Sequence, residues 1–382
     1  MKKHITFALL FAAALTAQAQ QGGISGEMLN QIKQSYKATP ADKAIRNALG
    51  GTSINTLALN QENRADFDTE FSHKVLSKGI TDLQSSGRCW LFTGLNVLRS
   101  QMIAKYGLDE MEFSQNYCFF FSSSAGFAPV AAASRSCKPN SFSFSPIRLL
   151  IFPVYRMLVL TLGEPVSTFT WSLKGGEAKE YTPVSFYKEF LGNDLTNNYV
   201  MLMNDPSREF YKCYEIDFDR HRYDGKNWTY VNLPIEDIKE IAIASIKDST
   251  MMYFSCDVGK FLDSKRGLLD PDNYDYESLM GTTFGMDKKQ RIQTFSSGSS
   301  HAMTLMAVDL DKAGKPKKWM VENSWGSASG YRGHLIMTDK WFDEYMFRVV
   351  AEKKYVPAKV LDILKQKPIR LPAWDPMFAD EE

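Results

Sequence analysis

The residue best placed for nucleophilic chemistry in this sequence is Cys89. It stands in the stretch SSGRCWLF (residues 85–92), between a Ser-Ser-Gly turn and a run whose apolar residues recur every three or four positions. That period predicts a helix from about Trp90 to a stop at Gly107, with Ser85 or Ser86 as its N-cap. A thiol at a helix N-terminus meets the positive end of the helix dipole and backbone N–H groups, and both favour the reactive thiolate.

A thiolate needs a base, and the sequence offers a histidine with an orienting amide. His301 stands at the entrance to a predicted strand, and Asn323 lies on the next strand. The two positions average to 312, inside the turn DKAGKP (residues 311–316), so antiparallel pairing brings them opposite or nearly opposite, within roughly 5 Å at Cβ. The Asn323 oxygen would accept from one ring nitrogen and leave the other for the thiol. Trp325 falls on the same face and would shield that hydrogen bond from water.

Each of these residues alone has an ordinary explanation. Most single cysteines are core residues, a lone histidine beside a strand is more often structural, and a lone asparagine is more often a turn or edge residue. Three complementary residue types in a chain with only five histidines favour a Cys-His-Asn catalytic site.

The elements that must position these residues differ between the two halves of the chain. A helix is predicted over 235–246 and a strand over 251–256, followed by DVGK (257–260), which we expect to support the cleft or subunit contacts. Residues 301–350 are rich in hairpin signals. A helical front half and a strand-rich back half predict an α+β fold with two lobes.

Composition argues against several other classes of protein. The 382 residues carry a formal net charge of +1, so nothing points to nucleic acid or to an anionic membrane surface. No glycine-rich nucleotide loop occurs, and we expect no cofactor. The histidines are scattered and no CxxC or HExxH motif occurs, so no metal site is predicted either.

The first residues have the pattern of a signal peptide. Lys2 and Lys3 precede an apolar run from Ile5 to Leu15, and Ala17-Gln18-Ala19 forms a small-x-small cleavage site. We therefore expect residues 1–19 to be removed and the protein to be periplasmic or secreted. A buried amphipathic N-terminal helix is the alternative.

Five cysteines, an odd number, leave at least one outside any disulfide within the chain. We interpret the four other than Cys89 as small buried apolar residues rather than as a disulfide framework.

One stretch departs from the rest in composition. Residues 113–163 contain no Asp or Glu, although the chain has 44 of them, and within this stretch residues 122–146, a mixture of Ser, Ala and Phe, have neither a helical nor a strand period. Arg148, Pro153 and Arg156 interrupt its apolar part, so no membrane span is predicted. A locally shifted reading frame is one explanation of this composition.

The motifs around the three residues resemble those of a known family. SSGRCWLF, SSHAMT (299–304) and VENSWG (321–326) are similar to papain-type cysteine peptidases, and within them to the bleomycin hydrolase and aminopeptidase C family. Further similar stretches include MNDPSREFYKCYEIDF (203–218), MTDKWFDEYMFRVV (337–350) and LPAWDPM (371–377). The similarity covers most of residues 70–120 and 160–377.

The resemblance implies a papain-like fold with Cys89 on a helical lobe and with His301 and Asn323 on a β-rich lobe. It also implies a cysteine aminopeptidase that acts on peptides through an acyl-enzyme, with Cys89 as nucleophile, His301 as base and then acid, and Asn323 orienting His301. A homo-hexamer is implied as well, with the C-terminus of the chain in the cleft, where Glu382 would meet the free amine of the substrate.

On this basis the chain divides into a signal peptide and one peptidase domain. The parts are the signal peptide (1–19) and the domain (20–382), which comprises an N-terminal arm (20–75), a helical lobe (76–120), the unusual segment (121–155) and a β-rich lobe with the tail (156–382).

Three departures from the family pattern matter for activity. The family has a glutamine six residues before the cysteine, as an oxyanion donor, where this chain has Leu83; Gln84 is the nearest candidate for that role. The Cys-to-His separation is shorter than in the family, and the missing part falls in 121–155. The tail FADEE (378–382) stands where small residues are expected, with an exposed acidic end as the alternative.

These departures leave other interpretations open. The first is a catalytically impaired family member that acts as a peptide-binding or oligomeric scaffold. The second is the product of a disrupted gene that does not fold cooperatively.

Overall fold

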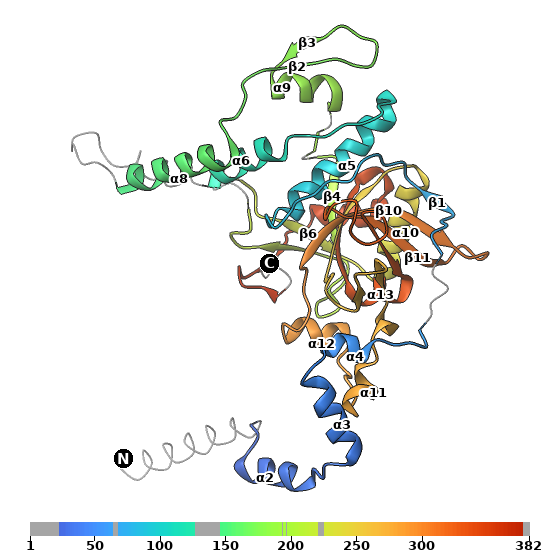
Figure 1. Cartoon of the computed structure of the whole chain (residues 1–382). Coiled ribbons are helices and arrows are strands. Elements are labelled where there is room, and N and C mark those ends of the chain that lie inside the picture. The colour runs from blue at the N-terminus through green and yellow to red at the C-terminus, as the bar shows by residue number, and fades with distance from the viewer. Residues whose placement is uncertain are drawn as a thin grey trace, which may run out of the picture. The chain divides into compact units, whose positions relative to one another are not determined.

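The computed structural model describes residues 23–63, 68–126, 146–192, 194–195, 197–220 and 225–376 (Figure 1). The predicted signal peptide, Cys137 and Glu382 lie outside the described residues. The chain divides into two compact units, one made of the residues up to Leu59 with Tyr276–Gly281 and the other made of Asn60–Asp275 with Thr282–Glu382.

The first unit is helical. Its helices are α2 (Gly26–Ser35), α3 (Pro40–Leu49), α4 (Ile54–Ala58) and α11 (Tyr276–Met280). Ser25, Thr39 and Ser53 cap α2, α3 and α4 by accepting a backbone N–H of the first turn. The expected N-terminal arm, 20–75, thus contains helices that its weak apolar period does not predict, although the capping residues are a readable signal of them.

A twelve-stranded mixed sheet forms the framework of the second unit. Its order is β14-β5-β6-β4-β13-β7-β10-β11-β12-β9-β8, and β1 pairs with β10 outside that path. The strands are β1 (His73–Lys74), β4 (Tyr199–Met203), β5 (Lys212–Ile216), β6 (Thr229–Asn232), β7 (Met252–Cys256), β8 (Leu262–Asp263), β9 (Leu268–Leu269), β10 (His301–Leu310), β11 (Pro316–Glu322), β12 (His334–Thr338), β13 (Met346–Glu352) and β14 (Ile369–Leu371).

Helices and a small hairpin complete the second unit. They are α5 (Cys89–Tyr106), α6 (Gln115–Gly126), α8 (Pro146–Leu162), β2 (Phe169–Trp171), β3 (Lys179–Tyr181), α9 (Pro183–Phe186) with a π-helical turn (Tyr187–Leu191), α10 (Ile235–Lys247), α12 (Lys288–Gln293), α13 (Asp339–Tyr345), α14 (Ala358–Leu361) and 3-10 turns at Pro271–Asn273, Lys353–Tyr355 and Asp362–Lys365. The front half of the unit is mainly helical and the back half mainly strand, as the sequence predicts. Within the described chain, no helix combines the length and the apolar character needed to cross a membrane.

The main core lies where α10 and α13 pack against the sheet. Phe254 of β7, Trp319 of β11 and Phe342 of α13 are fully buried, and the Trp319 and Phe342 rings stack with centroids 4.6 Å apart. The predicted helix over 235–246 and the predicted strand over 251–256 are confirmed as α10 and β7. This core holds the central strands β7, β10 and β11 in place.

Helix α5 packs against β10 and β7. It ends at Gly107, whose φ of 61° is the left-handed conformation that terminates helices, so the predicted stop is confirmed. The predicted start is correct to within one residue, but the predicted cap is wrong. The N-cap is Arg88, which makes no side-chain capping bond, and the Ser86 hydroxyl donates to the Leu83 carbonyl instead.

Candidate active site

Cys89 is the first residue of α5 and is buried, with 6 % of its surface exposed. No side chain caps the helix, because its N-cap is Arg88, and a guanidinium has no acceptor for backbone N–H groups. The Arg88 guanidinium donates to Asn116 at 2.8 Å and lies over the rings of Phe92 and Phe119. The N-terminal N–H groups of α5 are therefore not satisfied by a capping side chain. Their partial positive charge favours a thiolate at Cys89.

His301 and Asn323 meet as the sequence predicts. His301 Nε2 lies 2.9 Å from Asn323 Oδ1, and both residues are buried. The same oxygen accepts the backbone N–H of Ser324 at 2.8 Å, which identifies it as the oxygen of the amide. His301 Nε2 must therefore carry the proton in this hydrogen bond, and Nδ1 is the ring nitrogen that can accept a proton from a thiol.

The strand register differs slightly from the expected one. Thr304 pairs with Glu322, so Asn323 lies diagonally rather than directly across from His301. The offset is already present at the turn, where Leu310 pairs with Pro316, and the two register shifts between these pairs cancel. Continued past Thr304, the same register places Trp325 opposite His301. The two rings stack with centroids 4.8 Å apart and an interplanar angle of 30°. Trp325 thus covers the histidine, as predicted from its place on the same face.

Cys89 and His301 line one cavity of about 550 Å³. The other residues that line it come from the segment before α5, from the segment after β7 and from the two ends of the β10–β11 hairpin: Leu83, Ser85, Gly87, Asp257, Val258, Gly259, Ser300 and Trp325. Three residues of DVGK thus line the cleft, which agrees with the first of the two roles expected for this stretch, while the role in subunit contacts stays a prediction. The cavity brings the Cys89 thiol and the His301 ring to the same space.

The segment before Cys89 is tied to the segment that carries Asn323. The backbone N–H of Leu83 donates to the Ser324 carbonyl at 2.9 Å, and the N–H of Gly326 donates to the Thr81 carbonyl at 3.1 Å. The buried Asn96 amide of α5 donates to the Thr81 hydroxyl at 3.0 Å. These bonds fix the approach to α5 relative to the end of β11.

A buried ion pair makes a second connection between the same two elements. Arg99 of α5 pairs with Glu322 of β11, next to Asn323, and their side chains are 3 % and 0 % exposed. Ser77 also donates to Glu322, and Arg99 donates to the Gly79 carbonyl at 3.2 Å. Burial raises the pKa of Glu322, and the positive charge of Arg99 opposes that rise. Sequence reasoning missed this pair, although a charged residue inside each of two apolar runs was a signal for it.

Leu83, which stands at the family's oxyanion-donor position, and Gln84, the candidate donor, are placed differently. Leu83 is buried, lines the cavity and packs with Cys89, Phe92 and Ala302. Gln84 is exposed, has a φ of 55°, and its amide donates to Asp82 at 2.8 Å. Its role as an oxyanion donor stays a prediction, as does the role of Glu382.

Two further cysteines behave as the sequence suggests. Cys213 is buried and Cys118 is partly buried, both carry free thiols, and burial raises the pKa of each. They differ from Cys89 in that neither lines the cavity that contains His301.

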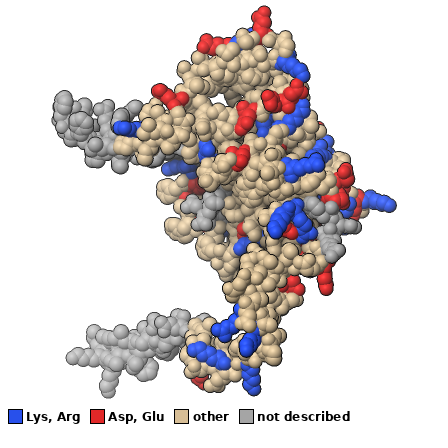
Figure 2. Space-filling view, viewed as in Figure 1, with Lys and Arg blue, Asp and Glu red and all other residues tan. Residues whose placement is uncertain are grey.

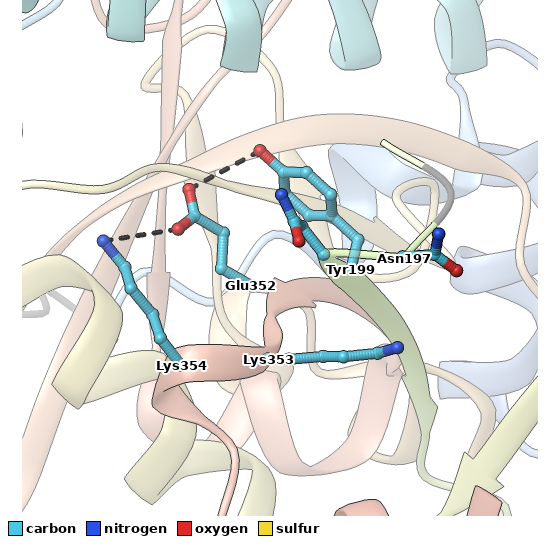
Figure 3. A pocket seen from close by; sticks show the side chains of 6 residues that line it. Asn197, Tyr199, Glu352, Lys353 and Lys354 are labelled. Atoms are coloured by element: carbon cyan, nitrogen blue, oxygen red, sulfur yellow. Dashed lines mark hydrogen bonds and ion pairs between the residues drawn. The ribbon is translucent and has the colours of Figure 1, made fainter. Parts of the chain in front are cut away.

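A second hollow, of about 290 Å³, lies at the junction of β4 and β13 (Figure 3). Glu352 accepts from Tyr199 at 3.5 Å and pairs with Lys354 at 3.3 Å there. None of the three predicted catalytic residues lines this hollow.

Over the face of the second unit shown in Figure 2, acidic and basic side chains are interspersed, in keeping with the small net charge. Among the described residues, no group of three His, Cys, Asp or Glu side chains is arranged to hold a metal ion.

Comparison with known proteins gives a consistent result. The Peptidase C1-like family matches residues 23–124 and 147–378, so the match leaves out residues 125–146, within the unusual segment. Bleomycin hydrolase of Homo sapiens is 31 % identical over 450 positions, covering 94 % of this chain and 98 % of that protein. Aminopeptidase C of Lactococcus lactis subsp. cremoris is 28 % identical over 434 positions, covering 93 % and 99 %. Both alignments are longer than the 382 residues of this chain, so each relative has residues that this chain lacks.

The fold is shared as well. The crystal structure of PepW from Lactobacillus rhamnosis HN001 superposes with a TM-score of 0.81 at 28 % identity, covering 94 % of this chain and all of that one. The expected papain-like α+β fold is confirmed. With a family match over most of its length and relatives at about 30 % identity, the chain belongs to the Peptidase C1-like family, among the relatives of bleomycin hydrolase and aminopeptidase C.

Proposed function

We propose that this protein is a cysteine aminopeptidase that removes N-terminal residues from peptides through an acyl-enzyme. The observation that carries the proposal is the shared cavity, in which Cys89 at the start of α5 faces the same space as His301, whose Nε2 is held by Asn323. Membership in a family whose named members include aminopeptidases supports the same reaction.

In the proposed reaction, His301 Nδ1 takes the Cys89 proton, and the thiolate attacks the carbonyl carbon of the scissile peptide bond. N–H groups at the start of α5 stabilise the oxyanion. His301 then protonates the leaving amine as the C–N bond breaks, which leaves a thioester on Cys89. Water, deprotonated by His301, attacks the thioester and releases the N-terminal residue and the thiol.

Selection for a free amine is proposed to come from the C-terminal segment. Asp375 is buried and pairs with Arg208, which also pairs with Asp205. A Cβ atom placed on Gly298 would lie 3.4 Å from the Pro376 carbonyl oxygen, so the chain passes the loop that leads into His301. Glu382 lies outside the described residues, and its proposed role is to bind the ammonium group of the substrate.

The test compares the reactivity of Cys89 with that of two internal controls. Iodoacetamide alkylation at mildly acidic pH, read by mass spectrometry, should modify Cys89 much faster than Cys118 or Cys213, because burial keeps the latter thiols protonated. His301→Ala should remove that advantage. Hydrolysis of aminoacyl amides by the wild-type protein should be lost in Cys89→Ala, and hydrolysis that persists in Cys89→Ala refutes the proposal.

The position of Leu83 favours one second candidate, a peptide-binding or oligomeric scaffold with little turnover. Leu83 places an apolar side chain on the cavity wall where the family pattern has an amide donor. The alkylation experiment separates the two, since a scaffold needs no reactive thiolate. Turnover that Cys89→Ala abolishes excludes the scaffold interpretation.

We extend the proposal to location and assembly. The pattern of residues 1–19 supports export to the periplasm or the medium, which N-terminal sequencing of the mature protein would check. Resemblance to the family supports a homo-hexamer, which light scattering on the purified protein would check.

A further inference from the structure

The loop that leads into His301 is held at each of its four residues. The Ser297 hydroxyl donates to Asp257 Oδ2 at 2.7 Å, the Ser300 hydroxyl donates to Asp257 Oδ1 at 3.4 Å, and the Gly298 N–H also donates to this carboxylate. On its other side, the Ser299 hydroxyl bonds with Arg348 at 2.9 Å and with Ser255. The serine-rich loop is therefore a fixed element rather than a solvated linker.

Asp257 is buried, with 7 % of its surface exposed, and lines the same cavity as Cys89 and His301. Its place in the chain explains its reach, because it follows Cys256, which pairs with His301 across β7 and β10. Lys260 Nζ lies 4.0 Å from Asp257 Oδ2 in a partly exposed position. Burial raises the pKa of Tyr345, and the charge of Asp257 adds to that rise. Burial raises the pKa of Asp257, while the bond from Ser297 and the charge on Lys260 oppose that rise.

A buried carboxylate with a raised pKa does not stabilise the folded chain by its charge. What the carboxylate supplies is three acceptor positions, and all three donors belong to the loop that ends at His301. Asn323 fixes the ring from one side, and this loop fixes the backbone from which the ring extends. The second constraint matters because a displacement of about 1 Å in a catalytic group can cost roughly 10²-fold in rate.

We propose that Asp257 is a positioning residue that holds the Ser297–Ser300 loop and thereby sets the place of His301 relative to Cys89. The inference rests on the proposed function, in which His301 acts on Cys89. It assigns no contact between Asp257 and the substrate.

The experiment compares Asp257→Asn and Asp257→Ala with the control Asp263→Asn. Asp263 is a similarly enclosed carboxylate that accepts two backbone N–H groups and pairs with Arg266 at 2.7 Å, away from the cavity. Asparagine keeps one acceptor oxygen, so we expect kcat to fall about 10-fold in Asp257→Asn and about 10²-fold in Asp257→Ala. KM should stay within about 2-fold of wild type in both, and Asp263→Asn should leave both constants unchanged.

Two further measurements distinguish positioning from a role in stability alone. Cys89 alkylation at mildly acidic pH should slow in both Asp257 variants by about the same factor as kcat. The melting temperature of Asp257→Asn should stay close to that of the wild type, because asparagine keeps the size of the side chain and one acceptor oxygen while it replaces a carboxyl group whose pKa burial raises. A lower melting temperature with unchanged kcat and unchanged alkylation in the folded protein overturns the proposal.

Hydrogen exchange separates this proposal from the proposed function. If wild-type Cys89 shows no enhanced reactivity, the proposed function fails, but the amides of residues 297–301 still report on the loop. Exchange in that loop at least about 10-fold faster in Asp257→Asn or Asp257→Ala, with β7 and β10 unchanged, supports the positioning role. Unchanged exchange in the loop overturns it.

Discussion

Removal of Arg99 should destabilise the protein by an amount that depends on pH. Glu322 is fully buried beside Arg99, and burial already raises its pKa against the attraction of that cation. In Arg99→Met the cation is gone, so the Glu322 carboxyl group is left buried with the Ser77 hydroxyl as its side-chain donor, and it must either stay unpaired as an anion or keep its proton. Breaking one partner of a buried ion pair costs about 3–5 kcal/mol in the free energy of unfolding.

The sign of the pH dependence follows from the raised pKa. A carboxyl group with a raised pKa in the folded state contributes stability at low pH that is lost as the pH rises through that pKa. Without Arg99 the folded pKa rises further, so the variant holds the Glu322 proton over a pH range in which the wild type has released it. In that range the loss of stability grows by up to about 1.4 kcal/mol per pH unit. Between pH 5.5 and 7.5 the destabilisation should therefore increase by up to about 2.7 kcal/mol.

Urea unfolding followed by tryptophan fluorescence at these two pH values measures the effect. Glu322→Gln is the matched control. It leaves the Arg99 charge unpaired, and the loss in the free energy of unfolding that it causes should be the same at both pH values. The double variant Arg99→Met with Glu322→Gln removes both charges and should be more stable than either single variant. An Arg99→Met cost that is equal at both pH values, or a double variant whose cost is the sum of the two single costs, would refute the reasoning.

Two other predictions concern the catalytic groups themselves. Asn323→Ala should lower kcat about 10- to 100-fold with KM nearly unchanged, because it removes the acceptor for His301 Nε2, and steady-state kinetics on an aminoacyl amide measures the change. A fall in kcat/KM that comes entirely from KM would argue against an orienting role. Leu83→Gln should raise kcat at least about 10-fold by placing an amide donor on the cavity wall beside Cys89, whereas the apolar control Leu83→Met should not. Equal activity of the two Leu83 variants would show that the oxyanion needs no donor at this position.

The parts of the site that the sequence predicts are those encoded by local patterns. The 3.6-residue period after Cys89 and the glycine at 107 fix the course of α5 to within one residue at its start. Hairpin symmetry about residues 311–316 brings His301 and Asn323 together, although the observed pairing of Leu310 with Pro316 centres the turn on residue 313 and makes the contact diagonal. Capping residues predicted the starts of helices less well. Ser85 and Ser86 do not cap α5. Ser25, Thr39 and Ser53 do cap helices, but the apolar period does not predict those helices.

The sequence by itself therefore determined the three candidate residues, Cys89, His301 and Asn323, and the helix and strands that carry them. Only the tertiary structure decided what holds them in register. Arg99 and Glu322 are 223 positions apart, and Asp257 reaches Ser297 across 40. Neither pair has a spacing that a helix or a hairpin repeats, so no local period reveals it. Such contacts form because buried charges and buried donors must find partners within the folded chain, and the partners available are set by how the sheet and α5 pack.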